Sequence, residues 1–181
     1  NLTLRDVKID VSDTGSYWVE GKAALSVQGK GNVEIELDGE NELKSGVQRA
    51  GLEKNTSTST GTLTLKDDNK EAGSLTATGG ASAAGIGGGY LGDGKNITIT
   101  GGTVNTTGGD NGGAGIGGGA EGGGGNNITI KGGTVTATGG GYRGNSGAGI
   151  GGGSSGSGEN ITINDGKVTA TGGNYAAGIV G

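Results

Sequence analysis

A six-residue box, Ala-Gly-Ile-Gly-Gly-Gly, recurs at a nearly fixed interval along the second half of this chain. Complete copies occupy residues 84–89, 114–119 and 148–153, and a partial copy occupies 177–181. A unit of this size that repeats at a fixed period buries its apolar face only when neighbouring units stack on it. The box therefore predicts a solenoid, in which the functional surfaces are long and regular.

A second motif, an alternation of apolar residues and threonine, extends the same period upstream. Its clear copies read Asn-Ile-Thr-Ile at 96–99, 127–130 and 160–163. With weaker early copies included, the first apolar residues lie 31, 30, 34, 31 and 33 positions apart, at Leu2, Val33, Leu63, Ile97, Ile128 and Ile161. A period of 30–34 residues thus spans the whole chain of 181 residues.

A third motif follows each alternation, and both have the two-residue period of β-strands. The third motif occupies residues 74–78, 103–107, 134–138 and 167–171. The 49 glycines have no three-residue register, which excludes a collagen helix. We therefore expect an all-β fold: a single-stranded, right-handed parallel β-helix, or β-solenoid, with about six coils and three faces.

The same pattern predicts which side chains point inward. Ile97, Ile99, Val104 and Ile86 should stack on the corresponding residues of the next coil, Ile128, Ile130, Val135 and Ile116. Threonines should point outward, on coils about 4.8 Å apart. Three asparagines at equivalent positions, Asn96, Asn127 and Asn160, should stack at one corner, although each also begins a glycosylation sequon.

Composition sets further bounds on the fold and its partners. Only 29% of residues are apolar and 3% aromatic, which is typical of disorder, but the strict alternation favours a thin solenoid core. Residues 1–73 hold 13 of the 18 acids, so we expect one solenoid over 1–181, with degenerate charged coils at 1–73 and regular coils at 74–181. The net charge of −5 argues against nucleic acid, and the longest apolar runs are too short for membrane insertion.

Motifs for catalysis and cofactor binding fail when their context is considered. Residues 113–118 match the dinucleotide pattern G-x-G-x-x-G, but glycines follow where that site needs a helix. The chain has no Cys or His, and its acids are scattered over the regular coils. We therefore expect no enzyme, no cofactor and no metal site.

The remaining candidates for a binding site lie on the outer surface. Outward positions of the third motif predict a grid of polar side chains formed by Thr103, Asn105, Thr107, Thr134, Thr136, Thr138, Thr169 and Thr171. Aromatic residues that can stack on sugar rings lie in loops beside the box, at Trp18, Tyr90, Tyr142 and Tyr175. Threonine also suits any solvent-facing strand, and each tyrosine could simply cover the solenoid edge.

The box and the repeat Asn-Ile-Thr-Ile-x-Gly-Gly-Thr-Val-x-Ala-Thr-Gly-Gly resemble those of large surface proteins of Gram-positive bacteria. Such proteins are often labelled carbohydrate-binding-domain-containing or adhesin-like. The resemblance is strong over residues 74–181 and weak over 1–73. It implies an extracellular or wall-attached β-helix that binds glycans or mediates adhesion.

Three functional hypotheses follow from the sequence. The leading one is a non-catalytic surface module that binds a polysaccharide, or a host or wall glycan. The second is ice binding by the threonine grid, which Asn105 and Lys167 interrupt. The third is a purely structural stalk or filament repeat that associates end to end through its open strand edges. An enzyme is the weakest alternative.

Overall fold

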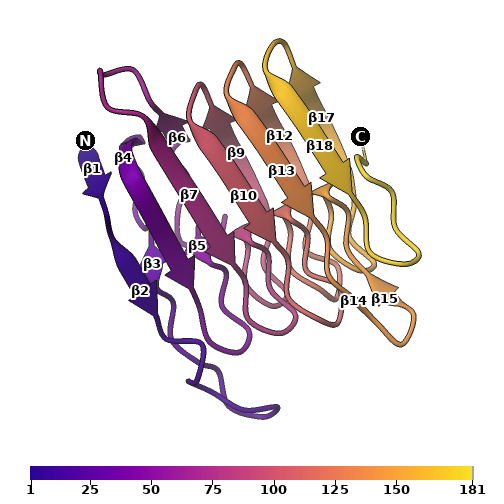
Figure 1. Cartoon of the computed structure of the whole chain (residues 1–181). Helices are drawn as coiled ribbons and strands as arrows, with labels where there is room; N and C mark the ends of the chain where they lie inside the picture. The colour runs from indigo at the N-terminus through magenta and orange to yellow at the C-terminus, as the bar shows by residue number, and fades with distance from the viewer. Residues whose placement is uncertain (181) are drawn as a thin grey trace.

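A computed structural model describes residues 1–180, which form strands and turns only (Figure 1). Strands of successive coils pair in parallel and build three faces along a common axis. The prediction of an all-β parallel β-helix is confirmed. The last position of the partial fourth box, Gly181, lies outside the described residues.

Each face contains one strand from nearly every coil. Face 1 contains β1 (Leu2–Arg5), the first part of β4 (Val33–Lys44), β6 (Leu63–Lys66), β9 (Gly94–Ile99), β12 (Gly125–Ile130) and β17 (Gly158–Ile163). Face 2 contains β2 (Lys8–Asp10), the second part of β4, β7 (Gly73–Thr78), β10 (Thr103–Thr107), β13 (Thr134–Thr138) and β18 (Lys167–Thr171). Face 3 contains the two-residue strands β3 (Leu25–Ser26), β5 (Leu52–Glu53), β8 (Ile86–Gly87), β11 (Ile116–Gly117) and β16 (Ile150–Gly151).

We number the coils 1 to 6 by the order of their strands on face 1. The chain crosses face 1 six times, from β1 in coil 1 to β17 in coil 6, and so completes about five turns between them. Coil 6 contributes full strands to faces 1 and 2, but on face 3 only Ile179 forms a bridge, to Ile150. Coil 5 carries an extra hairpin of β14 (Gly141–Tyr142) and β15 (Asn145–Ser146).

The core consists of ladders of aliphatic side chains, one rung per coil. Ile97 pairs with Ile128 and Ile99 with Ile130 on face 1. The predicted rungs on the other faces are confirmed as well, with pairs Val104–Val135 and Ile86–Ile116. All eight residues are fully buried, and complete burial of such a side chain contributes about 1.5–3 kcal/mol.

The register of coil 1 differs from the one predicted. Leu2 pairs with Ile35, two residues beyond the expected partner Val33, and Val33 instead pairs only with Leu63 of coil 3. A shift of two residues keeps every side chain on its own side of the sheet, because side chains alternate with a period of two. The hydrophobic pattern therefore could not distinguish the two registers.

Acidic residues of the charged coils hold the corner between faces 1 and 2. Asp38 is fully buried, accepts a hydrogen bond from Asn69 Nδ2 at 2.6 Å and pairs with Arg5 Nη2 at 2.8 Å. Glu36 contributes to the same corner. It is buried, and its Oε1 accepts from the backbone N–H groups of Asp68 and Asn69. These carboxylates replace the short glycine corners of the later coils.

The three predicted asparagines occupy equivalent positions on face 1, within strands β9, β12 and β17 and not at the predicted corner. Asn96, Asn127 and Asn160 have φ values of 58°, 55° and 54°, so each forms a left-handed bulge within its strand. The Nδ2 group of Asn127 donates to Oδ1 of Asn96 at 2.6 Å. No helix within residues 1–180 is long and apolar enough to cross a membrane.

Candidate functional site

Four of the five aromatic residues converge on one surface cleft. The chain has four tyrosines, one tryptophan and no phenylalanine, and all five aromatic side chains are exposed. The cleft has a volume of about 650 Å³ and lies over the loops that flank face 3. Its lining is formed by Tyr17, Trp18, Val47, Gln48, Ala81, Ser82, Tyr90, Asn111, Glu121, Tyr142, Arg143 and Asn145.

The first aromatic pair sits at the tip of a tight turn in coil 1. Ser16 and Val19 exchange two backbone hydrogen bonds, of 2.8 and 3.1 Å, which leaves Tyr17 and Trp18 as the two tip residues. Their rings meet edge to face with centroids 4.6 Å apart, a favourable geometry for aromatic pairs. Trp18 is nonetheless 87% exposed. The fold therefore presents a large apolar ring to solvent and not to the core.

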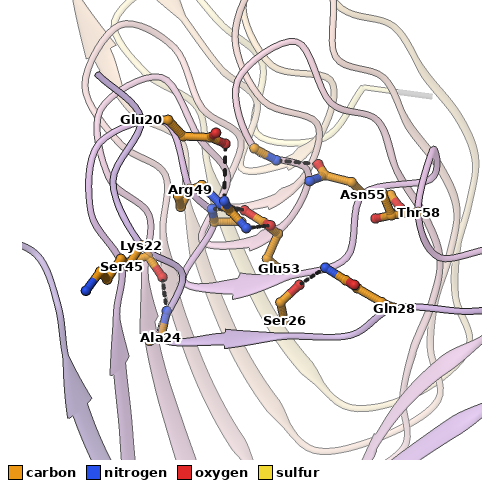
Figure 2. Close-up of polar contacts among 12 residues, drawn as sticks. Glu20, Lys22, Ala24, Ser26, Gln28, Ser45, Arg49, Glu53, Asn55 and Thr58 are labelled. Carbon is orange, nitrogen blue, oxygen red and sulfur yellow. Dashed lines mark hydrogen bonds and ion pairs between the residues drawn. The ribbon is translucent and has the colours of Figure 1, made fainter. Parts of the chain in front are cut away.

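A guanidinium clamp ties this turn to coil 2 (Figure 2). Arg49 forms two hydrogen bonds to the buried carboxylate of Glu53, from Nε at 2.8 Å and from Nη2 at 2.5 Å. Its Nη1 donates to Glu20 at 3.2 Å, two residues after Trp18. The hydrogen bond to Glu53 raises the pKa of Arg49 above its ordinary value. Arg49 is thus a permanent cation that positions the end of the aromatic turn.

Tyr90 belongs to a different loop, the one that follows face 3 in coil 3. Its backbone N–H donates to the carbonyl of Gln48 at 3.0 Å. The preceding N–H, of Gly89, donates to Oδ1 of Asn55 at 2.7 Å. Both acceptors belong to coil 2, so coil 2 orients the Tyr90 loop as well as the aromatic turn of coil 1.

Tyr142 lies on the hairpin of β14 and β15, which projects from the coil edge (Figure 1). Arg143 and Gly144 form its turn with φ values of 48° and 92°, as required in a type I′ turn. The Arg143 guanidinium lies 5.0 Å from the centre of the Tyr142 ring, within the range of a cation–π contact. The hairpin delimits the cleft at coil 5, opposite the aromatic turn of coil 1.

The floor between these two ends is polar and repetitive. Gln48, Ser82 and Asn111 each occupy the loop before face 3, in coils 2, 3 and 4, with φ values of 67°, 68° and 68°. A non-glycine residue is uncommon in the left-handed region of φ. The occurrence of one at the same place in three successive coils shows that these coils share one corner conformation. Each coil therefore adds one uncharged amide or hydroxyl group to the floor.

The predicted polar grid lies on the outer side of face 2, away from the cleft. Thr103, Thr134 and Lys167 form one row across β10, β13 and β18. The next two rows contain Asn105, Thr136 and Thr169, and then Thr107, Thr138 and Thr171. All eight predicted positions point outward; Thr138 is half-buried and the rest are exposed.

Charged residues interrupt the same rows in the first two coils. Glu40, Glu42 and Lys44 occupy them in β4. A shallow depression of about 450 Å³ marks the boundary between charged and neutral coils, between Glu42 and Thr103. The mainly uncharged rows, which Lys167 interrupts in coil 6, therefore begin only with coil 3.

The structure thus groups the predicted residues unevenly. It brings Trp18, Tyr90 and Tyr142 together, whereas Tyr175 is 80% exposed and is not part of the cleft lining. Sequence reasoning missed the polar floor. The available signal was a polar residue shortly before each inward aliphatic residue of face 3: Gln48 before Leu52, Ser82 before Ile86 and Asn111 before Ile116. Within residues 1–180 no group of three or more side chains is arranged to hold a metal ion.

Comparison with known families bears on the regular coils. The family model described as "Beta helix repeat" matches residues 71–90, 97–120, 128–154 and 161–179. These four segments correspond to coils 3 to 6 and include the three complete copies of the box and the first three residues of the partial copy. No curated protein and no solved structure matches the chain.

Proposed function

Since this chain is a β-helix repeat protein, we propose that it acts through its repetitive surface, as a non-catalytic module that binds glycan in the aromatic cleft. The observation that carries this proposal is the convergence of Trp18, Tyr90 and Tyr142, from coils 1, 3 and 5, on one exposed site. Flat aromatic faces beside amide and hydroxyl groups suit sugar rings, which combine apolar C–H faces with hydroxyl edges. Small-ligand sites generally pair apolar surface with a few polar groups in this way.

The chemistry of the cleft supports binding rather than hydrolysis. Most glycoside hydrolases use a pair of carboxylates that flank the scissile bond. Among the described residues that line the cleft, Glu121 is the one carboxylate. A lone exposed carboxylate can accept hydrogen bonds from sugar hydroxyls without cleaving the chain. We place this module outside the cell or on its wall, where polysaccharides or host glycans would be its partners.

The test is affinity electrophoresis through gels that contain plant, mucin or bacterial wall polysaccharides. We expect the protein to be retarded by at least one of them. Trp18→Ala and Tyr142→Ala should each weaken retardation about tenfold, because truncation of an aromatic anchor at a binding site commonly costs more than 1 kcal/mol. Tyr175→Ala is the matched control and should leave retardation unchanged. Unretarded migration in every gel overturns the proposal.

Ice binding is a second candidate, which the register of face 2 favours. Thr134, Thr136 and Thr138 lie in line with outward residues of β10 and β18, at spacings of about 4.8 Å between coils and 6.6–7 Å along the strand. A flat lattice of hydroxyls can match a crystal surface. Thermal hysteresis at millimolar protein that Thr136→Tyr abolishes would support this candidate, and no hysteresis would dismiss it.

A further inference from the structure

The cleft extends along the solenoid axis, because its lining comes from stacked coils. Its lining comes from consecutive coils: Trp18 in coil 1, Gln48 in coil 2, Ser82 in coil 3, Asn111 in coil 4 and Tyr142 in coil 5. Face 3 pairs in parallel and in register from β3 to β16, so the site follows the solenoid axis. Four steps of about 4.8 Å give a length of about 19 Å between its two aromatic ends. A site of this form suits a chain molecule better than a single sugar.

The floor repeats with the same step as the coils. Backbone hydrogen bonds between the loops on either side of face 3 fix this repeat. The carbonyl of Gln48 accepts from the N–H of Tyr90, and the carbonyl of Ser82 accepts from the N–H of Ala120. The side chains of Gln48, Ser82 and Asn111 therefore recur at about 4.8 Å. This step is close to the length of one pyranose unit in an extended chain, so successive sugars can meet equivalent groups.

The charge of the cleft indicates an uncharged ligand. One acid, Glu121, and one base, Arg143, belong to the lining, and Arg143 lies against the Tyr142 ring. A polyanionic glycan would need a basic surface, and a polycationic one would need several acids. The remaining polar lining groups are amides and hydroxyls, including those of Asn111 and Asn145. Specificity would therefore come from stacking and neutral hydrogen bonds.

We infer that the ligand is a linear, uncharged polysaccharide in an extended conformation, which lies parallel to the solenoid axis with Trp18 and Tyr142 as its terminal stacking platforms. This inference rests on the proposed function and adds the class of glycan and its direction. In a chain that coils tightly, successive sugars would not match the spacing of about 4.8 Å between the polar side chains of coils 2 to 4. A chain shorter than the cleft would contact one aromatic end only.

The experiment is isothermal titration with cello-oligosaccharides of increasing length, as the extended probe, and malto-oligosaccharides of equal length, as the coiled one. For the cello series we expect affinity to rise about tenfold or more with length and to level off once the oligomer spans about 19 Å. Trp18→Ala and Tyr142→Ala should each remove most of this gain while affecting the shortest oligomers less. Tyr175→Ala should leave the series unchanged, and added salt should have little effect.

The outcomes separate this inference from the proposed function. Equal affinity for short and long cello-oligosaccharides, preference for the malto series, or a steep salt dependence would each overturn the extended, uncharged ligand. If Trp18→Ala still weakens binding in such a case, glycan binding at the cleft stands. Absence of binding by both series, together with absence of retardation in every polysaccharide gel, overturns both proposals.

Discussion

Thr106 places a hydroxyl group in the core, at a level where the neighbouring coils have alanine. It pairs with Ala77 on one side and Ala137 on the other. Its side chain is buried, and within the described residues its Oγ1 finds no hydrogen-bond partner. A buried polar group without a partner costs about 1–3 kcal/mol.

We predict that Thr106→Val raises the free energy of unfolding by about 1 kcal/mol, because valine keeps the shape and removes the unpaired hydroxyl. Urea denaturation followed by circular dichroism measures the change. Thr106→Ser is the control, since it keeps the hydroxyl and loses a methyl group, and it should destabilise the protein. A valine variant less stable than the wild type would show that the hydroxyl is satisfied in solution.

Asp38 connects three coils and makes stability depend on pH. Hydrogen bonds from Asn69 and Arg5, in that order of effect, lower its pKa below the ordinary value. A carboxylate with a lowered folded-state pKa stabilises the fold above its unfolded pKa, near 3.9, and this contribution is lost as pH falls through the folded value.

The corresponding prediction is that Asp38→Asn lowers the melting temperature at pH 7 and flattens its decline below about pH 4. Melting curves across this range, with Asp13→Asn at an exposed turn as control, provide the measurement. If the Asp38 variant keeps the steep acid decline of the wild type, other groups control it.

At the scale of the elements, the box in the regular coils is a corner whose backbone geometry requires glycine. The residue after the inward isoleucine, at Gly87, Gly117 and Gly151, has φ values of 130°, 133° and 139°. A Cβ placed on Gly117 would lie 1.9 Å from the carbonyl oxygen of Gly151 in the next coil. Both the backbone angle and the close approach of coils therefore require glycine here.

Gly117→Ala should destabilise the protein by about 2 kcal/mol or more, because strain and overlap act together. Gly31→Ala provides the contrast, since a Cβ there meets nothing within 4 Å. Denaturant titration of the two variants measures the difference. Similar stability of both would contradict the assignment of the box as an obligatory corner.

In coil 2 a carboxylate side chain replaces the glycine carbonyl that closes this corner in the regular coils. In coils 3 and 4 the N–H of Ala84 and Ala114 donates to the carbonyl of Gly88 and Gly118, at 2.9 and 3.0 Å. In coil 2 the side chain of Glu53 accepts instead, from the N–H of Ala50 at 3.1 Å. One carboxylate thus closes the corner and also anchors the Arg49 clamp.

Spacing in the sequence predicted the core because the positions equivalent to Ile97 and Val104 recur with the coil period and are buried in coils 3 to 5. It could not predict the cleft. Tyr90 follows the box in its coil, whereas Tyr142 precedes it, and their convergence depends on two loops folding over a two-residue strand. Loops of unequal length have no fixed register, so Tyr175 looked equivalent to Tyr142 although it lies apart.

At the scale of the whole molecule, the regular stacking of coils sets the distances between the loops. Each coil contacts mainly its neighbours, so the position of a loop is set by the stack beneath it. This arrangement places Trp18 and Tyr142, which are 124 positions apart in the chain, at opposite ends of one cleft. The proposed function follows from that placement.

Trp18 is the only tryptophan of the chain and lies at the proposed contact surface, so its fluorescence tests the central claim most directly. We predict that titration with a polysaccharide that retards the protein shifts Trp18 emission to shorter wavelength, with saturation. Tyr142→Ala should weaken the response about tenfold, and Tyr175→Ala should preserve it. Unchanged Trp18 emission when the polysaccharide is fully bound would contradict the account, because the glycan would then occupy another surface.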